Sequence, residues 1–327
     1  MKLLLELSME CESLARSEAI AAAEALGSRS KILERGPGVF VLQTDADPVA
    51  LGKRLGLCHI LSEWLFTCSP EELEARAAEL DVEGPIRVHS TKVGEKKVDL
   101  AGISKRVGAI VGKSRGVDLR NPRTDLRIVF SQNVYVGRAL WSVDRSSFEK
   151  RKNRYMPYFY PASLHPKYAR ALVNLSRVRP DESILDPFCG TGAVLAEAAL
   201  IDLNPIGSDI SDKMIEGARK NLEHLRLGAD LHMCDVGDIG KIIGRVSGIA
   251  TDPPYGKSTS TKGESIPKLY ERAFKSFSDV LEKGSIVAIV VPRLSLLDDA
   301  HSFSLAEKHA LWVHRSLTRH FCVLKKI

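Results

Sequence analysis

The chain has 327 residues, of which 44% are hydrophobic and 27% are charged, and this composition excludes a wholly disordered protein. No apolar run approaches the roughly 18 residues of a membrane span, and Glu6 comes too early for the core of a signal peptide, so we expect a cytoplasmic protein without a membrane segment. The net charge of +6 is uneven: it is −5 over 1–80, +9 over 81–160 and +2 over 161–327. Such a basic segment is typical of proteins that bind a polyanion, although it can also be only solubilising.

The cysteines are spread along the chain without a C-x-x-C pair. This spacing argues against a disulfide scaffold and against a structural zinc module, so we expect no metal site. We predict buried free thiols at Cys11, Cys58, Cys68, Cys189, Cys234 and Cys322.

Residues 1–80 alternate patterns of strand and helix without a catalytic signal. We predict strands at 3–7 and 39–42, a helix at 12–26 closed by Gly27, and a helix at 70–80 capped by Ser69. These elements indicate a small α+β subdomain.

Residues 81–144 continue this alternation at higher positive charge. The patterns predict strands at 86–89, 127–130 and 134–136, a helix at 100–111, and a Gly- and Arg-rich loop at 112–123. The stretch 145–161 is polar and basic, then aromatic, and has no periodicity, so we interpret it as a linker.

Residues 162–327 have the pattern of a doubly wound α/β domain. Short β-rich runs are found at 183–188, 205–210, 230–236, 248–252, 285–291, 311–317 and 320–325. Predicted helices separate the first six of these runs, at 192–201, 211–227, 237–244, 266–282 and 294–308. Strand and helix in alternation indicate a parallel sheet, which the last two runs close as a hairpin.

A glycine-rich turn, Gly190-Thr191-Gly192, joins the first strand of this domain to a helix. Backbone N–H groups and a positive helix end therefore meet at the carboxyl edge of the sheet. The turn lacks the Gly-Lys-Ser/Thr of a phosphate loop, and Leu195 stands where a dinucleotide fingerprint needs a small residue. A nucleoside cofactor with a carboxylate and no pyrophosphate remains, and S-adenosylmethionine fits this description.

Three acids at strand ends support this hypothesis. Asp186 can face the cofactor ammonium, Asp209 can accept from both ribose hydroxyls, and Asp235 can accept from the adenine amine. An aspartate at a strand end is otherwise often a helix cap, and Ser211 after Asp209 keeps that alternative open. We place the cofactor among Asp186, Phe188, Gly190, Thr191, Gly192, Asp209, Ile210, Asp235 and Val236.

The fourth strand ends in Asp252-Pro253-Pro254-Tyr255, a pattern of methyltransferases that act on exocyclic amines. A base amine is a poor nucleophile, because its lone pair is delocalised into the ring. The Asp252 carboxylate and the Pro253 carbonyl can each accept one N–H, and the two prolines keep these acceptors rigid. We therefore predict catalysis by Asp252, Pro253 and Tyr255, with Pro254 and Tyr255 against the substrate base. The alternative is a simple turn.

Together these motifs, with Ser163-Leu164-His165-Pro166-Lys167 before them, resemble the archaeal tRNA guanosine-10 N2-methyltransferases. The resemblance covers most of 155–327. It implies a Rossmann-like methyltransferase domain over 162–327 and an N-terminal α+β region, namely a ferredoxin-like subdomain at 1–80 and a THUMP-like RNA-binding domain at 81–144. In this family the segment matching 163–174 lines the cofactor pocket, so His165 either lies near the methionine end or caps a helix.

The same resemblance implies tRNA as the partner and gives the basic segment a use. Its predicted phosphate contacts are Lys105, Arg106, Lys113, Arg115, Arg120, Arg123 and Arg127, which would position RNA without reading bases. Eukaryotic relatives act with a small zinc-binding activator, so an equivalent partner is a further hypothesis.

Three alternative functions stay open on the sequence alone. One is N2-methylation of guanine at another tRNA or rRNA position, with one or two methyl groups added. A second is an amino-methylating DNA methyltransferase, because Asp-Pro-Pro-Tyr serves those enzymes as well. The third is a catalytically silent RNA-binding protein that keeps the fold, which the intact Asp252 and glycine turn argue against.

Overall fold

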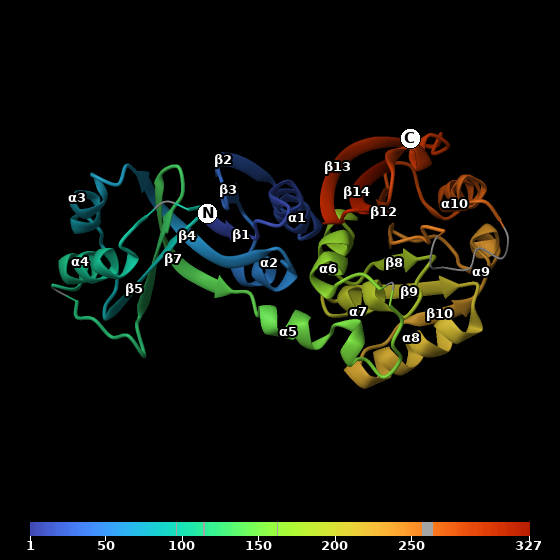
Figure 1. Cartoon of the computed structure of the whole chain (residues 1–327), viewed down its shortest axis with the longest axis horizontal. Helices are drawn as coiled ribbons and strands as arrows, with labels where there is room; N and C mark the ends of the chain where they lie inside the picture. The colour runs from blue at the N-terminus through green and yellow to red at the C-terminus, as the bar shows by residue number, and fades with distance from the viewer. Residues whose placement is uncertain (96, 114, 162, 257–263) are drawn as a thin grey trace. The chain divides into compact units, whose positions relative to one another are not determined.

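The computed structural model describes residues 1–95, 97–113, 115–161, 163–256 and 264–327, so Ser114 of the predicted loop and Ala162 at the predicted domain start lie outside the described residues. The chain forms two compact units (Figure 1). Unit 1 consists of Met1–Glu12, Ser28–Gly52 and Cys58–Val143, and unit 2 of Ser13–Gly27, Lys53–Leu57 and Asp144–Ile327.

Unit 1 contains one mixed seven-stranded sheet in the order β2-β3-β1-β4-β7-β6-β5. All neighbouring strands pair antiparallel except β5 and β6, which are parallel. Because β4 pairs with β7, the ranges 1–80 and 81–144 share a single sheet. The strands are β1 (Lys2–Leu7), β2 (Ser30–Gly36), β3 (Val39–Thr44), β4 (Cys58–Cys68), β5 (Ile86–Lys92), β6 (Thr124–Phe130) and β7 (Val134–Ser142).

The two predicted helices of this region differ in how they begin. α4 (Leu100–Gly112) confirms the predicted helix, and the Asp99 side chain caps it by accepting from the Gly102 N–H at 2.9 Å. α3 (Leu73–Ala78) is shorter than the predicted helix at 70–80, and Ser69 is not its cap. Instead the Ser69 N–H donates to the Glu72 carboxylate. β2, β4 and α2 (Pro48–Arg54) were not predicted.

Unit 2 contains the predicted doubly wound sheet, in the order β10-β9-β8-β11-β12-β14-β13. The first five strands are parallel, and β14 runs antiparallel between β12 and β13. The strands are β8 (Ser183–Asp186), β9 (Asn204–Asp209), β10 (Asp230–Met233), β11 (Gly248–Thr251), β12 (Ile286–Val291), β13 (Phe303–His314) and β14 (Leu317–Lys326).

Helices cover both faces of this sheet (Figure 1). α9 (Ile239–Ile242) and α10 (Ile266–Val280) pack with Leu185, Ile249 and Val287 of the strands in one apolar core. α6 (Pro166–Leu175), α7 (Ala193–Ala199) and α8 (Asp212–Leu225) lie on the other face, where Tyr168 of α6 contacts Phe321 of β14. Successive side chains of each strand point to opposite faces of the sheet, so the two helical layers each pack against apolar strand residues in a separate core.

The predicted helix at 294–308 is wrong. Only Leu294–Leu297 form a 3-10 turn, and β13 starts at Phe303. Exposure alternates from Glu307 to the buried Leu311, which is the two-residue period of a strand. The final hairpin is therefore longer than predicted.

The stretch 145–161 is not irregular throughout, because it contains α5 (Arg145–Lys150) and a 3-10 turn at Asn153–Tyr155. Side chains fix it to unit 2: Arg151 pairs with Glu197 at 2.7 Å, and the Tyr158 N–H donates to Asn221 at 2.9 Å. Ion pairs and hydrogen bonds hold this stretch in place, so its sequence shows no periodic apolar pattern from which its helical turns could be predicted.

α1 (Glu12–Ala25) belongs mostly to unit 2 although it lies early in the chain. The buried Glu18 carboxylate accepts from the N–H groups of Gly56 and Leu57, both at 2.8 Å, and from the Asn174 amide at 3.0 Å. Burial raises the pKa of Glu18 to about 7.

All six cysteines are free thiols, as the sequence predicts, and five of them are buried. The prediction of a buried thiol is wrong for Cys11, which is partly exposed. Among the described residues, no helix combines the length and apolarity needed to cross a membrane.

Candidate active site

Three of the predicted acids gather at the carboxyl edge of the unit 2 sheet. Asp186 ends β8, Asp209 ends β9, and Asp252 directly follows β11, and these parallel strands are neighbours. The charges of Asp252 and Asp209 both contribute to raising the pKa of Asp186, after burial as the main cause, so the three carboxyl groups share one electrostatic environment. The edge concentrates negative charge where open α/β sheets bind ligands.

Asp186 is almost fully buried and joins two strand ends. Its Oδ1 accepts from the Thr251 hydroxyl at 2.7 Å and from the Phe188 N–H at 3.2 Å. Burial raises its pKa to about 7. Because Thr251 precedes Asp252, the hydrogen bond from Thr251 fixes the strand from which Asp252 projects.

The glycine turn has the backbone geometry that its sequence predicts. Gly190 has φ +49° and Gly192 φ +84°, and Gly192 is the N-cap residue of α7. A Cβ at Gly190 would meet no atom within 4 Å, so the turn borders open space. The Gly190 N–H donates to Asp209 at 3.1 Å, which ties the turn to β9.

Asp209 also accepts from the Ser211 N–H at 2.9 Å, and burial raises its pKa. Ser211 is the N-cap position of α8 but makes no side-chain cap hydrogen bond. Asp209 therefore connects the glycine turn to the start of α8. Its contact at the start of α8 agrees in part with the alternative that this aspartate serves to cap a helix. Ile210 beside it is 38% exposed.

Asp235 differs from the other acids, because a cation already neutralises it. It accepts from the Gly237 N–H at 2.8 Å and forms an ion pair with Arg272, which also pairs with Glu264 at 2.8 Å. Arg272 was not predicted. The side chain of Val236 is buried in the core that includes residues of α10, and its contact with the cofactor stays a prediction.

His165 follows the helix-cap alternative. Its Nδ1 accepts from the Lys167 N–H at 3.2 Å as the N-cap of α6, and its Nε2 lies 3.2 Å from Glu149. Burial lowers the pKa of its imidazole. The ring is therefore held by α5 and α6, and the residue of 163–174 that contacts the glycine turn by a hydrogen bond is Ser163, whose hydroxyl lies 2.8 Å from that of Thr191.

The Asp252-Pro253-Pro254-Tyr255 segment contains a hydrogen bond that the sequence did not reveal. The Tyr255 hydroxyl donates to Asp252 Oδ1 at 2.5 Å. Burial raises the pKa of Asp252 to about 6, while the nearby Arg319 and the Tyr255 hydroxyl lower it. Tyr255 therefore orients the carboxylate, and its predicted stacking on a base stays a prediction.

Two further residues near Asp252 were missed by sequence reasoning. Arg319 lies on β14, and the charge of Asp252 reaches the buried phenol of Tyr270 on α10 and contributes to its raised pKa. The Tyr270 hydroxyl has no hydrogen-bond partner among the described residues. Only the register of β14 against β12 brings Arg319 to this edge, so no local motif could have indicated it.

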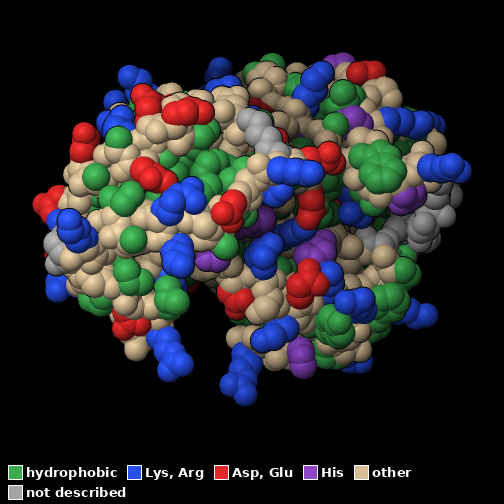
Figure 2. Space-filling view, turned by 60° about the vertical axis from the view of Figure 1, so that its left-hand side comes forward, with side chains coloured by type: hydrophobic (Ala, Val, Ile, Leu, Met, Phe, Trp, Pro, Cys, Tyr) green, Lys and Arg blue, Asp and Glu red, His purple; other side chains and the backbone are tan. Residues whose placement is uncertain are grey.

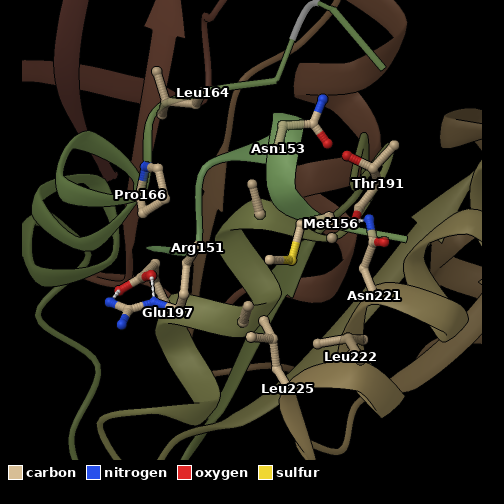
Figure 3. Close-up of a pocket in the computed structure, with 13 residues that line it drawn as sticks. Arg151, Asn153, Met156, Leu164, Pro166, Thr191, Glu197, Asn221, Leu222 and Leu225 are labelled. Carbon is tan, nitrogen blue, oxygen red and sulfur yellow. Dashed lines mark hydrogen bonds and ion pairs between the residues drawn. The ribbon is translucent and has the colours of Figure 1, made fainter. Parts of the chain in front are cut away.

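A cavity borders the glycine turn on its other side (Figure 3). It lies among α7, α8 and the 151–166 segment, and Figure 3 shows the Arg151–Glu197 ion pair at its rim. Met156, Leu222 and Leu225 give it apolar walls, and none of the edge acids lines it. The cavity therefore touches the turn at Thr191 and Gly192 and is separate from the acid-lined edge.

The predicted phosphate contacts in unit 1 fall into three groups. Lys105, Lys113 and Arg120 are exposed. Arg106, Arg115 and Arg123 form ion pairs with Glu74, Asp81 and Glu83, respectively. Figure 2 likewise shows Lys and Arg side chains interspersed with Asp and Glu over the face in view.

Arg127 contradicts its prediction as a phosphate contact. It is 7% exposed, and its guanidinium donates to both oxygens of Glu6 at 2.9 and 3.0 Å. A buried bidentate pair is not available to a phosphate, because exposing it would leave Glu6 as an unpaired buried charge.

Comparison with known proteins places this geometry in a family. The model of the UPF0020 family (RMKL-like, methyltransferase domain) matches residues 153–320. The tRNA (guanine(10)-N2)-dimethyltransferase of Methanothermobacter thermautotrophicus is 33% identical over 340 residues, covering 100% of both chains. The enzyme of the same name from Pyrococcus abyssi is 35% identical over 236 residues, covering 69% of this chain and 70% of the relative.

Solved structures agree on the fold. TrmN from Thermus thermophilus matches with a TM-score of 0.56 and 24% identity over 100% of both chains. SMU.472, solved as a complex with SAH, matches with a TM-score of 0.52 and 16% identity over 100% of this chain and 98% of that one. The family match and the full-length relative agree with the Asp-Pro-Pro-Tyr segment at the carboxyl edge of the sheet. They show that this chain belongs to the RMKL-like methyltransferase family and is a methyltransferase.

Proposed function

We propose that the protein transfers methyl groups from S-adenosylmethionine to the exocyclic N2 of a guanosine in tRNA, at position 10, once or twice on the same nitrogen. The observation that carries the proposal is the partly buried Asp252 at the end of β11, held by Tyr255 beside the glycine turn. The full-length relative named as a tRNA (guanine(10)-N2)-dimethyltransferase supports the substrate.

The residues around the glycine turn fit S-adenosylmethionine, which supplies an electrophilic methyl group. Open space over Gly190 and the left-handed Gly192 allow a ligand to approach the backbone and the N-terminus of α7. Asp209 lies where a ribose would be recognised, and Phe188, Thr191 and Ile210 flank the same turn. Arg272 donates to both oxygens of Asp235, so the adenine amine must share this carboxylate with the guanidinium.

Asp252 and the Pro253 carbonyl form the pair of acceptors for the base amine. Each accepts one N–H, so the nitrogen becomes pyramidal and its lone pair points away from both acceptors. Tyr255 holds the carboxylate in place, and the prolines limit backbone motion, so the acceptors are oriented before the substrate arrives. The amine loses a proton only after it has acquired the methyl group.

The basic segment of unit 1 remains our candidate for tRNA contact, without Arg127. The exposed Lys105, Lys113 and Arg120 are available directly, whereas Arg106 and Arg123 must exchange an acidic partner for a phosphate. We assign this region as THUMP-like on the resemblance alone, and a small zinc-binding activator is part of the same hypothesis. Each phosphate contact should add roughly 0.7–0.9 to the log–log salt slope of binding.

The proposal is tested by mass spectrometry of nucleosides from unmodified tRNA incubated with protein and S-adenosylmethionine. We expect N2-methylated guanosine, and none when the guanosine at position 10 is replaced by adenosine. Duplex DNA is a parallel substrate, and methylated adenine or cytosine there would favour the DNA methyltransferase alternative. Absence of S-adenosylhomocysteine with every substrate would contradict the assignment as an enzyme.

A further inference from the structure

The hairpin of β13 and β14 extends past the parallel strands at the carboxyl edge of the unit 2 sheet. Val291, the last residue of β12, pairs with His320, so Leu317–Arg319 and their partners on β13 lie beyond β12. β12 runs parallel to β11, whose next residue is Asp252. The free end of the hairpin is therefore at the same edge as the proposed catalytic segment.

The hairpin reaches the surroundings of Asp252. The positive charge of Arg319 lowers the pKa of both Asp252 and Tyr255. Arg319 pairs with the buried Leu311 across the hairpin, and the next pair toward the tip is Trp312 and Thr318. Trp312 thus lies one pair beyond the residue whose charge acts on the proposed catalytic carboxylate.

Trp312 is unusual for a large aromatic residue, because 70% of its surface is exposed. Among the described residues it is the most exposed large hydrophobic side chain. Val313 beside it is 37% exposed, and a bulge between Trp312 and His314 interrupts the register. The exposed indole and Val313 thus lie side by side at a bulged hairpin end, where they present apolar surface to solvent.

The charge of the hairpin defines the kind of partner. The segment 308–320 contains Lys308, Arg315 and Arg319, three histidines and no acidic residue. Arg315 is exposed at the tip of the hairpin, within this segment that carries no acidic side chain. Cations beside an exposed aromatic ring are the combination that binds single-stranded nucleic acid, through phosphate contacts and base stacking.

We propose that the tip of the β13–β14 hairpin, residues 312–316, binds the RNA strand next to the target guanosine, with Trp312 stacking on an unpaired base and Arg315 contacting a phosphate. The inference rests on the proposed function and adds a second RNA contact, on the methyltransferase unit itself. Alternate side chains point to opposite faces of a hairpin, so Trp312 and Arg319 lie on opposite sides. Trp312 therefore holds a flanking nucleotide and leaves the target base to the Asp252 side.

The test compares variants of the full chain in tRNA affinity and in steady-state methylation. Trp312→Ala should weaken tRNA binding and lower kcat/KM about tenfold or more, whereas Trp312→Phe, which keeps a stacking face, should stay within about threefold. Leu305→Ala is the matched control, because Leu305 is an exposed apolar residue at the far end of β13. Arg315→Ala should reduce the salt slope of binding by roughly 0.7–0.9.

Each outcome decides between explanations. Wild-type protein without tRNA methylation would end the proposed function, whatever the hairpin does. Normal methylation with unchanged affinity in Trp312→Ala would overturn the hairpin proposal alone. A variant that loses self-association in sedimentation but keeps tRNA affinity would assign the tip to a protein partner instead. S-adenosylmethionine binding unchanged in Trp312→Ala, with loss of tRNA affinity, supports the proposal and excludes misfolding.

Discussion

The carboxyl edge of the unit 2 sheet and the basic segment of unit 1 differ in whether their charged side chains have partners of opposite charge. At the edge, Asp186, Asp209 and Asp252 are drawn close together and burial raises the pKa of each. In the basic segment, many cations already have acidic partners, such as Arg106 with Glu74 and Arg123 with Glu83. The edge of unit 2 thus keeps several negative charges close together, whereas the basic segment of unit 1 neutralises many of its positive charges in ion pairs.

This difference indicates where chemistry is located. Exposed ion pairs satisfy charge at low cost, whereas a cluster of buried and partly buried carboxyl groups persists only where the fold holds it together. Here the constraint is the parallel sheet, which brings strand ends together regardless of their charge. The net charge of +9 over 81–160 therefore overstates the positive charge that is available to a ligand. The net charge of +2 over 161–327 gives no sign of the acidic cluster at the sheet edge.

The largest expected effect comes from removing the acid that the proposed chemistry uses. Asp252→Ala should lower kcat by about a hundredfold or more, because the base amine loses its charged acceptor, while S-adenosylmethionine affinity stays within a few-fold. Asp252→Asn keeps one acceptor oxygen and should retain more activity than Asp252→Ala. Single-turnover methylation of tRNA and calorimetric binding of the cofactor measure the two effects separately.

The matched control in unit 1 is Arg123→Ala, which removes an exposed cation from an ion pair. It should leave kcat unchanged and alter only tRNA affinity and its dependence on salt. Near-wild-type turnover in Asp252→Ala would falsify the assigned role of the acid edge.

Within unit 1, the buried Arg127 should behave unlike its exposed neighbours. Arg127→Met leaves the carboxylate of Glu6 without its bidentate partner and should destabilise the protein by about 3–5 kcal/mol. The double variant Glu6→Leu with Arg127→Met should recover much of that loss, because neither charge remains. Urea unfolding of both variants measures this difference. Equal stability of Arg127→Met and Arg123→Ala would show that the buried pair is no different from the exposed ones.

Glu18 tests whether α1 is part of the methyltransferase unit. Gln at this position has one acceptor oxygen, so at least one of the N–H groups from Gly56, Leu57 and Asn174 would face an amide NH2. Glu18→Gln should therefore lower the free energy of unfolding by about 1–3 kcal/mol. Glu24→Gln on the same helix, where the carboxylate pairs with Arg177 in a more exposed position, is the control. If Glu18→Gln and Glu24→Gln changed the free energy of unfolding equally, α1 would not unfold cooperatively with unit 2.

Most of the acid edge could be predicted from local sequence, because strand ends and glycine turns have local signatures. Asp186, Asp209 and Asp252 each end a short apolar run, and parallel strands place such ends side by side. Gly190 and Gly192 adopt the positive φ angles that such a turn needs. These features depend on residues close in the chain.

What local sequence could not predict depends on pairing over long distances. Arg127 meets Glu6 only because β1 and β6 share one sheet, and Arg272 reaches Asp235 from another element. Burial of a cation follows from such contacts and leaves no trace in local composition. The same reason explains why the helix predicted at 294–308 overlaps the first part of β13, since an exposed edge strand lacks the apolar run that marks a buried one.

The smallest expected effect concerns Arg319, whose positive charge acts on Asp252. Burial raises the pKa of Asp252 to about 6, and its charged carboxylate is a stronger acceptor of an N–H than its protonated form, so kcat/KM should fall as the pH drops through about 6. Arg319 lowers that pKa, so Arg319→Met should move this acid limb to higher pH and reduce activity a few-fold near pH 6, with little change at pH 8. Arg315→Met on the same hairpin should change tRNA affinity at every pH without moving the limb. Superimposable acid limbs for wild type and Arg319→Met would mean that Arg319 does not tune the carboxylate, and would leave burial and Tyr255 as the groups that set its pKa.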